Sequence, residues 1–135
     1  VLQRRLQIFP VLAADTVVTI DGCILGKPRN KEDAVEMLRT LSGRSHQVMT
    51  AISVVVNDVL QIRLSTSAVR FRELSEKEIR NYVTNHHVLD KAGAYAIQGM
   101  AAAFIVDISG SYSGIMGLPL YETAQLLEEA GITII

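Results

Sequence analysis

The spacing of apolar residues along the chain predicts four strands. Continuous runs of Val, Ile and Leu are typical of buried strands, whereas strict alternation is typical of a strand with one covered face. Alternation is clearest where apolar Val69 and Phe71 are interleaved with Arg70 and Arg72. The predicted strands are Val11–Ile20, His46–Val56, Val59–Leu74 and Phe104–Ile108, with two short further candidates at Ala94–Ile97 and Ile132–Ile135.

Start and stop signals predict three helices between these strands. Asn30 is a good N-cap, and Gly43 is well placed to end the helix that follows. Ser75 and Glu78 form a capping box, and Pro119 suits the first position of a helix. The predicted helices run over Lys31–Leu41, from Ser75 to about Thr84, and over Leu120–Ala130, while Asn85–Gly99 and the glycine-rich Gly110–Gly117 are predicted loops.

Strands and helices are interspersed without strict alternation. This order favours an α/β fold in which a mixed, twisted sheet has helices packed on its faces. The 135 residues fit a single domain, 1–135, without repeats or an internal linker.

Composition narrows the functional classes. The net charge is −1 and no basic block is present, so binding to a DNA or RNA polymer is not expected. The longest apolar runs are too short to span a bilayer, and Val1–Pro10 has no signal-peptide pattern. The lone Cys23 cannot form an internal disulfide, which is typical of a reducing compartment. We therefore expect a cytoplasmic protein with no membrane partner.

An acidic residue within an apolar strand is the strongest chemical signal. Asp15 lies within Val11–Ile20, and burying a carboxylate there is costly unless something pairs with it. Lys27 follows in a Gly-Lys-Pro turn, and Lys91 in an Asp-Lys-Ala-Gly segment. An acid and two lysines suggest a site for a metal-bound, multiply charged anion. Alternatively, backbone donors or an arginine satisfy Asp15, and both lysines are solvated surface residues.

Two polar residues are candidates for substrate recognition. Thr16 could bond a substrate or simply suit the strand through its branched shape. The amide of Gln98 can donate and accept, as a nucleobase edge requires, or it can bond to the loop backbone. His86-His87 lacks a third ligand nearby in the sequence, so the pair is not predicted to bind a metal.

The chain as a whole resembles the Maf family of nucleoside triphosphate pyrophosphatases. Any one of the matching segments is weak, but their order and density between Val11 and Gly131 are specific. These segments are Ala14-Asp15-Thr16-Val17-Val18, Leu25-Gly26-Lys27-Pro28, Leu41-Ser42-Gly43, His46-Gln47-Val48-Met49-Thr50, Phe71-Arg72, Asp90-Lys91-Ala92-Gly93-Ala94-Tyr95, Ile97-Gln98-Gly99, Gly110-Ser111-Tyr112 and Gly117-Leu118-Pro119.

The resemblance implies hydrolysis of a nucleoside triphosphate between its α and β phosphates with Mg²⁺ or Mn²⁺, in an enzyme that is often dimeric. Asp15 matches the catalytic proton acceptor and could also hold the metal. Lys27 and Lys91 would neutralise the triphosphate, while Thr16 and Gln98 match positions associated with substrate choice. The Asp-Thr pair with Ile-Gln-Gly is similar to the branch that acts on dTTP and UTP.

One departure from the family pattern concerns the N-terminus. Family members begin with a Ser-x-Ser-Pro-Arg-Arg-type loop after a first strand, and Val1–Pro10 matches only the end of the following segment. The expected domain therefore lacks the N-terminal strand and phosphate loop. Three interpretations stay open: a pyrophosphatase with a shortened chain, a catalytically weak or inactive nucleotide-binding or interaction protein, and an α/β domain without activity.

Overall fold

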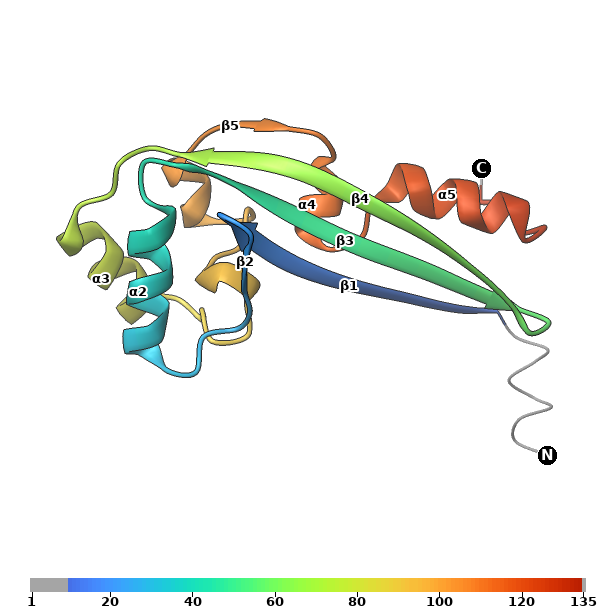
Figure 1. Cartoon of the computed structure of the whole chain (residues 1–135), viewed down its shortest axis with the longest axis horizontal. Helices are drawn as coiled ribbons and strands as arrows, with labels where there is room; N and C mark the ends of the chain where they lie inside the picture. The colour runs from blue at the N-terminus through green and yellow to red at the C-terminus, as the bar shows by residue number, and fades with distance from the viewer. Residues whose placement is uncertain (1–9, 135) are drawn as a thin grey trace.

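The computed structural model describes residues 10–134, in which a long, twisted antiparallel sheet carries helices along its length (Figure 1). Its strands lie in the order β2-β1-β3-β4-β5, and each neighbouring pair is antiparallel. The strands are β1 (Val11–Ile20), β2 (Cys23–Leu25), β3 (Ser45–Val56), β4 (Val59–Phe71) and β5 (Ile105–Ser109).

The sheet is built around the hairpin of β3 and β4. The turn residues Asn57 and Asp58 have φ values of 51° and 63°, a conformation that Asn and Asp adopt more readily than other side chains. The turn sets a register that pairs Thr50 with Ser65, and β1 pairs with the other edge of β3, so that Thr16 lies opposite Thr50.

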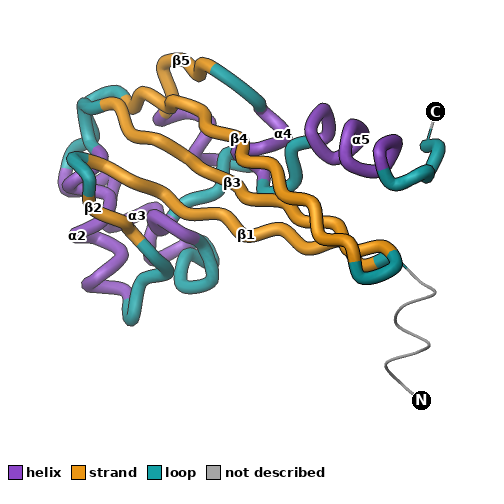
Figure 2. Tube along the Cα trace, turned by 45° about the vertical axis from the view of Figure 1, so that its right-hand side comes forward, coloured by secondary structure: helices purple, strands orange, loops and turns teal. Residues whose placement is uncertain are grey.

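The helices cover one face of this sheet. The α-helices are α2 (Lys31–Leu41), α3 (Glu76–Asn85), α4 (Tyr112–Met116) and α5 (Leu120–Glu129), and 3-10 turns occur at Ala92–Ala94 and Met100–Phe104. Helices α2 and α3 lie at one end of the long strands, and α5 lies toward the hairpin end (Figure 2). None of the helices in the described part of the chain has the length and apolarity needed to cross a membrane.

The core consists of two clusters on the helix-covered face. Alternate β3 residues from His46 to Val54 are buried there, as the period of two requires. The larger cluster joins β1, β3, β4, α2 and α3, and the smaller one joins Ile52 and Val54 to Leu126 of α5. On the opposite face Leu60, Ile62 and Leu64 remain more than half exposed.

The α/β class and most of the predicted elements are confirmed. Asn30 accepts a hydrogen bond from the backbone of Asp33, and the Ser75–Glu78 capping box is present. The sheet differs in detail from the mixed sheet expected, since its described strand pairs are antiparallel and its described helices pack on one face.

Several boundaries and three short segments were predicted wrongly. Strand β4 ends at Phe71 instead of Leu74, Ala94–Ile97 is not a strand, and the predicted loop Gly110–Gly117 contains helix α4. The tail from Ile132 to Ile134 forms no strand. Expectations for Val1–Phe9 and for Ile135 lie outside the described residues.

Candidate active site

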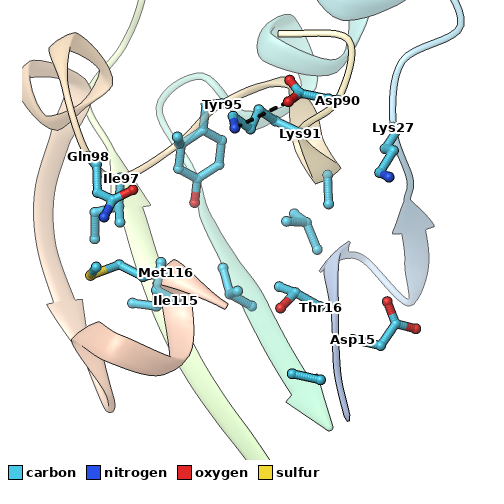
Figure 3. A pocket seen from close by; sticks show the side chains of 15 residues that line it. Asp15, Thr16, Lys27, Asp90, Lys91, Tyr95, Ile97, Gln98, Ile115 and Met116 are labelled. Atoms are coloured by element: carbon cyan, nitrogen blue, oxygen red, sulfur yellow. Dashed lines mark hydrogen bonds and ion pairs between the residues drawn. The ribbon is translucent and has the colours of Figure 1, made fainter. Parts of the chain in front are cut away.

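A cavity of about 270 Å³ opens on the helix-covered side of β1, and all the side chains proposed from the sequence line it. Its wall includes Asp15, Thr16, Lys27, Lys91 and Gln98 (Figure 3). These residues come from β1, from the segment after β2 and from the long loop between α3 and β5. The fold therefore brings together residues up to 83 positions apart in the sequence.

Strand β1 carries Asp15 and Thr16. Successive side chains of a strand point to opposite faces, so the two neighbours diverge. Thr16 is half-buried on the helix-covered face, whereas the carboxylate of Asp15 is exposed at the rim and points away from Thr16 (Figure 3). Strand β2 pairs with β1 only from Val18 to Ile20, so Asp15 lies on a stretch of β1 that has no described strand on that side.

A backbone contact connects the segments that carry the two lysines. The N–H of Gly93 donates to the carbonyl of Gly26, with 3.1 Å between nitrogen and oxygen. Gly93 has a φ of 72°, and a Cβ atom there would lie 3.1 Å from Val18 Cγ2. Only glycine fits this close approach without strain, and the contact places the Lys27 and Lys91 segments on the same cavity.

The two lysines differ in their surroundings. Lys91 Nζ lies 3.4 Å from a carboxylate oxygen of Asp90, which also lines the cavity. Lys27 makes no ion pair with any residue of the described range. Lys27 is therefore the less neutralised of the two cations available to an anionic ligand.

The cavity is divided between a charged side and an apolar side. Asp15 and Lys27 lie on one side, and Gln98 lies on the other with Ile97, Ile115 and Met116 (Figure 3). A ligand with an anionic end and a flat, polar ring would place each part against matching chemistry. Cavities that bind small molecules likewise combine apolar walls with a few precisely placed polar groups.

Tyr95 forms part of the inner wall of the cavity and is paired with the buried His46. Its hydroxyl lies 2.6 Å from Nε2 of His46, and both side chains are buried. Burial lowers the pKa of His46 to about 4. Burial, with a smaller effect from Tyr82, raises the pKa of Tyr95. Both groups are neutral at pH 7, so this wall adds no charge to the cavity.

The donor atoms fit a metal that is shared with a ligand rather than one enclosed by protein. Residues 10–134 contain no group of three or more His, Cys, Asp or Glu side chains that could hold a metal ion. Mg²⁺ is usually bound by one or two carboxylates together with phosphate oxygens. Asp15, an exposed carboxylate on the cavity rim, has the chemistry and the access that such a shared ligand needs.

His86 and His87 do not lie in this cavity. They line a separate hollow near the end of α3, where His86 stacks on Tyr82 with 4.5 Å between ring centroids. Its Nδ1 lies 3.0 Å from the carbonyl oxygen of Tyr82.

The lining residues that sequence reasoning did not select as parts of the site include Asp90, Tyr95, Ile115 and Met116. Asp90 and Tyr95 lie within the segment that carried the family resemblance. Ile115 and Met116 belong to the five-residue helix α4, which is too short to show a helical period. No signal in the sequence pattern could have placed them beside β1.

A family model and several relatives agree with one another. A family model described as Maf-like protein matches residues 2–130. The dTTP/UTP pyrophosphatase of Nitrosomonas europaea is 58% identical over 132 residues, which cover 98% of this chain and 64% of that protein. A protein of the same name from Nitrosospira multiformis is 58% identical over 126 residues, covering 93% of this chain and 61% of the relative.

A more distant relative has a broader name. The nucleoside triphosphate pyrophosphatase of Haemophilus ducreyi is 46% identical over 134 residues, covering 99% of this chain and 68% of that protein. The chain therefore spans roughly 60–70% of the length of these relatives.

Proposed function

Because the chain belongs to the Maf-like protein family, we propose that it is a nucleoside triphosphate pyrophosphatase that acts on dTTP and UTP. Water and the triphosphate would yield the nucleoside monophosphate, pyrophosphate and a proton. Relatives at 58% identity carry the name dTTP/UTP pyrophosphatase, which supports this choice of substrate. Modified pyrimidine nucleotides are further candidate substrates.

The observation that carries the proposal is the meeting of the five candidate side chains at one cavity. They come from three separate segments, yet their chemistry is complementary to one ligand class. The charged side suits a triphosphate, and the side with Gln98 suits a base of pyrimidine size. A site divided in this way favours a nucleotide over a simple inorganic anion.

In the proposed reaction Asp15 accepts the proton of the attacking water. Its exposed position at the rim leaves the carboxylate accessible to a water molecule. Lys27 and Lys91 neutralise the phosphates and hold the anhydride in line for attack. Thr16 and Gln98 contact the base. Cleavage of the bond between the α and β phosphates releases pyrophosphate.

We include Mg²⁺ or Mn²⁺ as the cofactor, with Asp15 as its protein ligand. When bound, such an ion offsets the negative charge of the phosphate oxygens and favours ionisation of a coordinated water.

A nucleotide substrate and the lone Cys23 fit a cytoplasmic location. A homodimer remains part of the proposal.

The first experiment measures pyrophosphate release from dTTP, UTP, CTP and GTP with Mg²⁺ or Mn²⁺. We expect turnover of dTTP and UTP, and a loss of about 10²-fold or more in kcat for Asp15→Asn, since a positioned general base contributes about 10²–10⁴-fold. Asp58→Asn is the matched control, because Asp58 lies in the turn between β3 and β4 and does not line the cavity.

Two results would contradict the proposal. Equal activity in Asp15→Asn would remove Asp15 from the reaction. Nucleotide binding without any turnover would favour a nucleotide-binding or interaction protein instead.

A further inference from the structure

A short chain of hydroxyl groups runs from the cavity wall into the core. Thr16 Oγ1 lies 2.8 Å from Thr50 Oγ1, across the β1–β3 pair. Thr50 Oγ1 in turn donates to the carbonyl oxygen of Gly114 in α4, at 2.7 Å. Thr16 lines the cavity, whereas Thr50 has no exposed surface.

The number of hydrogens determines the direction of this chain. A threonine hydroxyl has one hydrogen to donate and two lone pairs that accept, while a carbonyl oxygen only accepts. The hydrogen of Thr50 is used on Gly114, so the hydrogen between the two hydroxyls comes from Thr16. The reverse direction would leave the oxygens of Thr50 and Gly114 in contact without a hydrogen, which is costly in a buried site.

The carbonyl of Gly114, at the far end of these hydrogen bonds, is held firmly in place. The carbonyl of Gly114 also accepts the N–H of Gly117, at 3.1 Å. A Cβ atom at Gly114 would lie 2.7 Å from Ser65 Oγ, so the backbone of α4 is in close contact with β4. The N–H of Gly114 donates to Ser111 Oγ at 2.9 Å. The acceptor that orients Thr50 therefore cannot turn away.

The consequence concerns what Thr16 can offer to a ligand. Its only hydrogen is committed to Thr50, and no other donor within residues 10–134 reaches its oxygen. Thr16 therefore presents an acceptor to the cavity. Gln98 has no such constraint, because its side chain is exposed and makes no hydrogen bond within the described range. The amide of Gln98 can turn either its oxygen or its nitrogen toward a base.

We propose that Thr50 is a positioning residue that sets base selection by fixing Thr16 as a hydrogen-bond acceptor. This inference rests on the proposed function and deepens it. In uracil and thymine the ring nitrogen N3 carries a hydrogen that Thr16 can accept. In cytosine N3 is itself an acceptor and faces Thr16 without a hydrogen between them. Discrimination between UTP and CTP thus depends on a side chain that touches neither.

The test compares Thr50→Val with Thr50→Ser. Valine has the shape of threonine but no hydroxyl, so the Thr16 hydroxyl becomes free to donate or accept. Serine keeps the hydroxyl group and so preserves the direction of both hydrogen bonds. We expect the kcat/KM ratio of UTP over CTP to fall roughly tenfold in Thr50→Val, the effect of about one hydrogen bond, and to stay near the wild-type value in Thr50→Ser. A purely structural role would lower both rates and leave their ratio unchanged.

Titration with UMP and CMP separates this inference from the proposed reaction. An unchanged UTP:CTP ratio in Thr50→Val, or no preference in the wild type, overturns the inference and leaves the pyrophosphatase activity in place. If no triphosphate is hydrolysed but UMP binds more tightly than CMP and Thr50→Val abolishes that difference, the reaction is overturned and the inference is supported. If neither hydrolysis nor binding occurs, both are overturned.

A measurement on the wild-type protein does not depend on whether Thr50→Val folds. In proton NMR spectra the hydroxyl hydrogens of Thr16 and Thr50 should both exchange slowly with water, because each is held in a hydrogen bond. A Thr16 hydroxyl hydrogen that exchanges at the rate of a free hydroxyl would overturn the proposed direction of the chain.

Discussion

At the scale of single residues, the buried His46 sets a pH dependence. Its imidazole contacts the Tyr95 hydroxyl through Nε2 and packs edge-on against Phe71, with 5.0 Å between ring centroids. Its Nδ1 is buried and has no partner within the described residues. Protonation would place a charge where neither Tyr95 nor Phe71 can neutralise it. Burial thus lowers the pKa of His46 to about 4, below its ordinary value near 6.5.

This lowered pKa predicts a loss of stability in mild acid. The unfolded chain takes up the histidine proton near pH 6.5, whereas the folded chain takes it up only near pH 4. The contribution of the neutral His46 to the free energy of unfolding is therefore complete above pH 6.5 and falls as the pH drops toward 4. We expect the free energy of unfolding to fall by at most about 3 kcal/mol over this range. His46→Gln should remove most of this slope, whereas the exposed His87→Gln should retain it.

Urea unfolding between pH 7 and pH 4.5 provides the measurement. Equal slopes in the wild type and in His46→Gln would show that His46 does not control this pH dependence. The ion-paired Glu78 adds little to this slope. Arg72 lowers its pKa to about 2, so its protonation differs between the folded and unfolded chains mainly below its ordinary value of 4.5, at the acid end of the range, and it does so equally in the wild type and in His46→Gln.

At the scale of elements, the loop between α3 and β5 depends on a left-handed turn. Gly93 has a φ of 72° and Ala94 one of 68°, and Ala94 is fully buried. A non-glycine residue rarely adopts this conformation unless the surrounding structure holds it, and such strain clusters at functional sites. The turn brings Lys91 and Tyr95 to the same cavity and is closed by the hydrogen bond from Gly93 to Gly26.

Gly93→Ala should therefore disturb both stability and the site. Alanine at this position would have a strained φ, and its methyl group would lie 3.1 Å from Val18 Cγ2. We therefore expect the free energy of unfolding to fall by about 2–4 kcal/mol. Gly22→Ala is the matched control, because Gly22 also has a positive φ, 76°, but open space around it. Gly22→Ala should lower the free energy of unfolding by only about 1 kcal/mol. Denaturant unfolding measures both variants, and equal losses would contradict a role for the Val18 contact.

At the scale of the whole molecule, one face of the sheet is apolar and open. Leu60, Ile62 and Leu64 follow one another on this face of β4, with exposed fractions of 56%, 57% and 56%. Val11 of β1, at 45%, lies on the same side. No described helix packs against these residues. Contiguous exposed apolar surface of this kind favours association.

We therefore expect the chain to self-associate as its concentration rises, in line with the proposed homodimer. Ile62→Lys should weaken this association while changing the free energy of unfolding by only about 0.5 kcal/mol. Thr66→Lys is the control, because it adds the same charge on the same face of β4 outside the apolar residues. Light scattering after size-exclusion chromatography gives the mass of each variant. A monomeric wild type at every concentration would argue against association through this face.

Much of the fold could be predicted locally. The cap at Asn30 and the capping box of Ser75 and Glu78 each involve residues within one helical turn, so the sequence alone reveals them. The Asn57-Asp58 turn is equally local, because both of its residues are types that tolerate a positive φ. Helix α4 was missed because it spans only five residues, too few to show a helical period, although it packs against β3 and β4.

The sequence alone predicts Asp15, Thr16, Lys27, Lys91 and Gln98 as candidate site residues, because their residue types and the short motifs that carry the family resemblance contain chemical information. Their meeting at one cavity depends on tertiary structure, since the Gly93–Gly26 contact joins segments that share no local pattern. The direction of the Thr16–Thr50–Gly114 chain is likewise a tertiary property. It requires β1, β3 and α4 to lie within hydrogen-bond distance of one another, and hydrogen bonds between distant residues have no periodicity that a sequence could reveal.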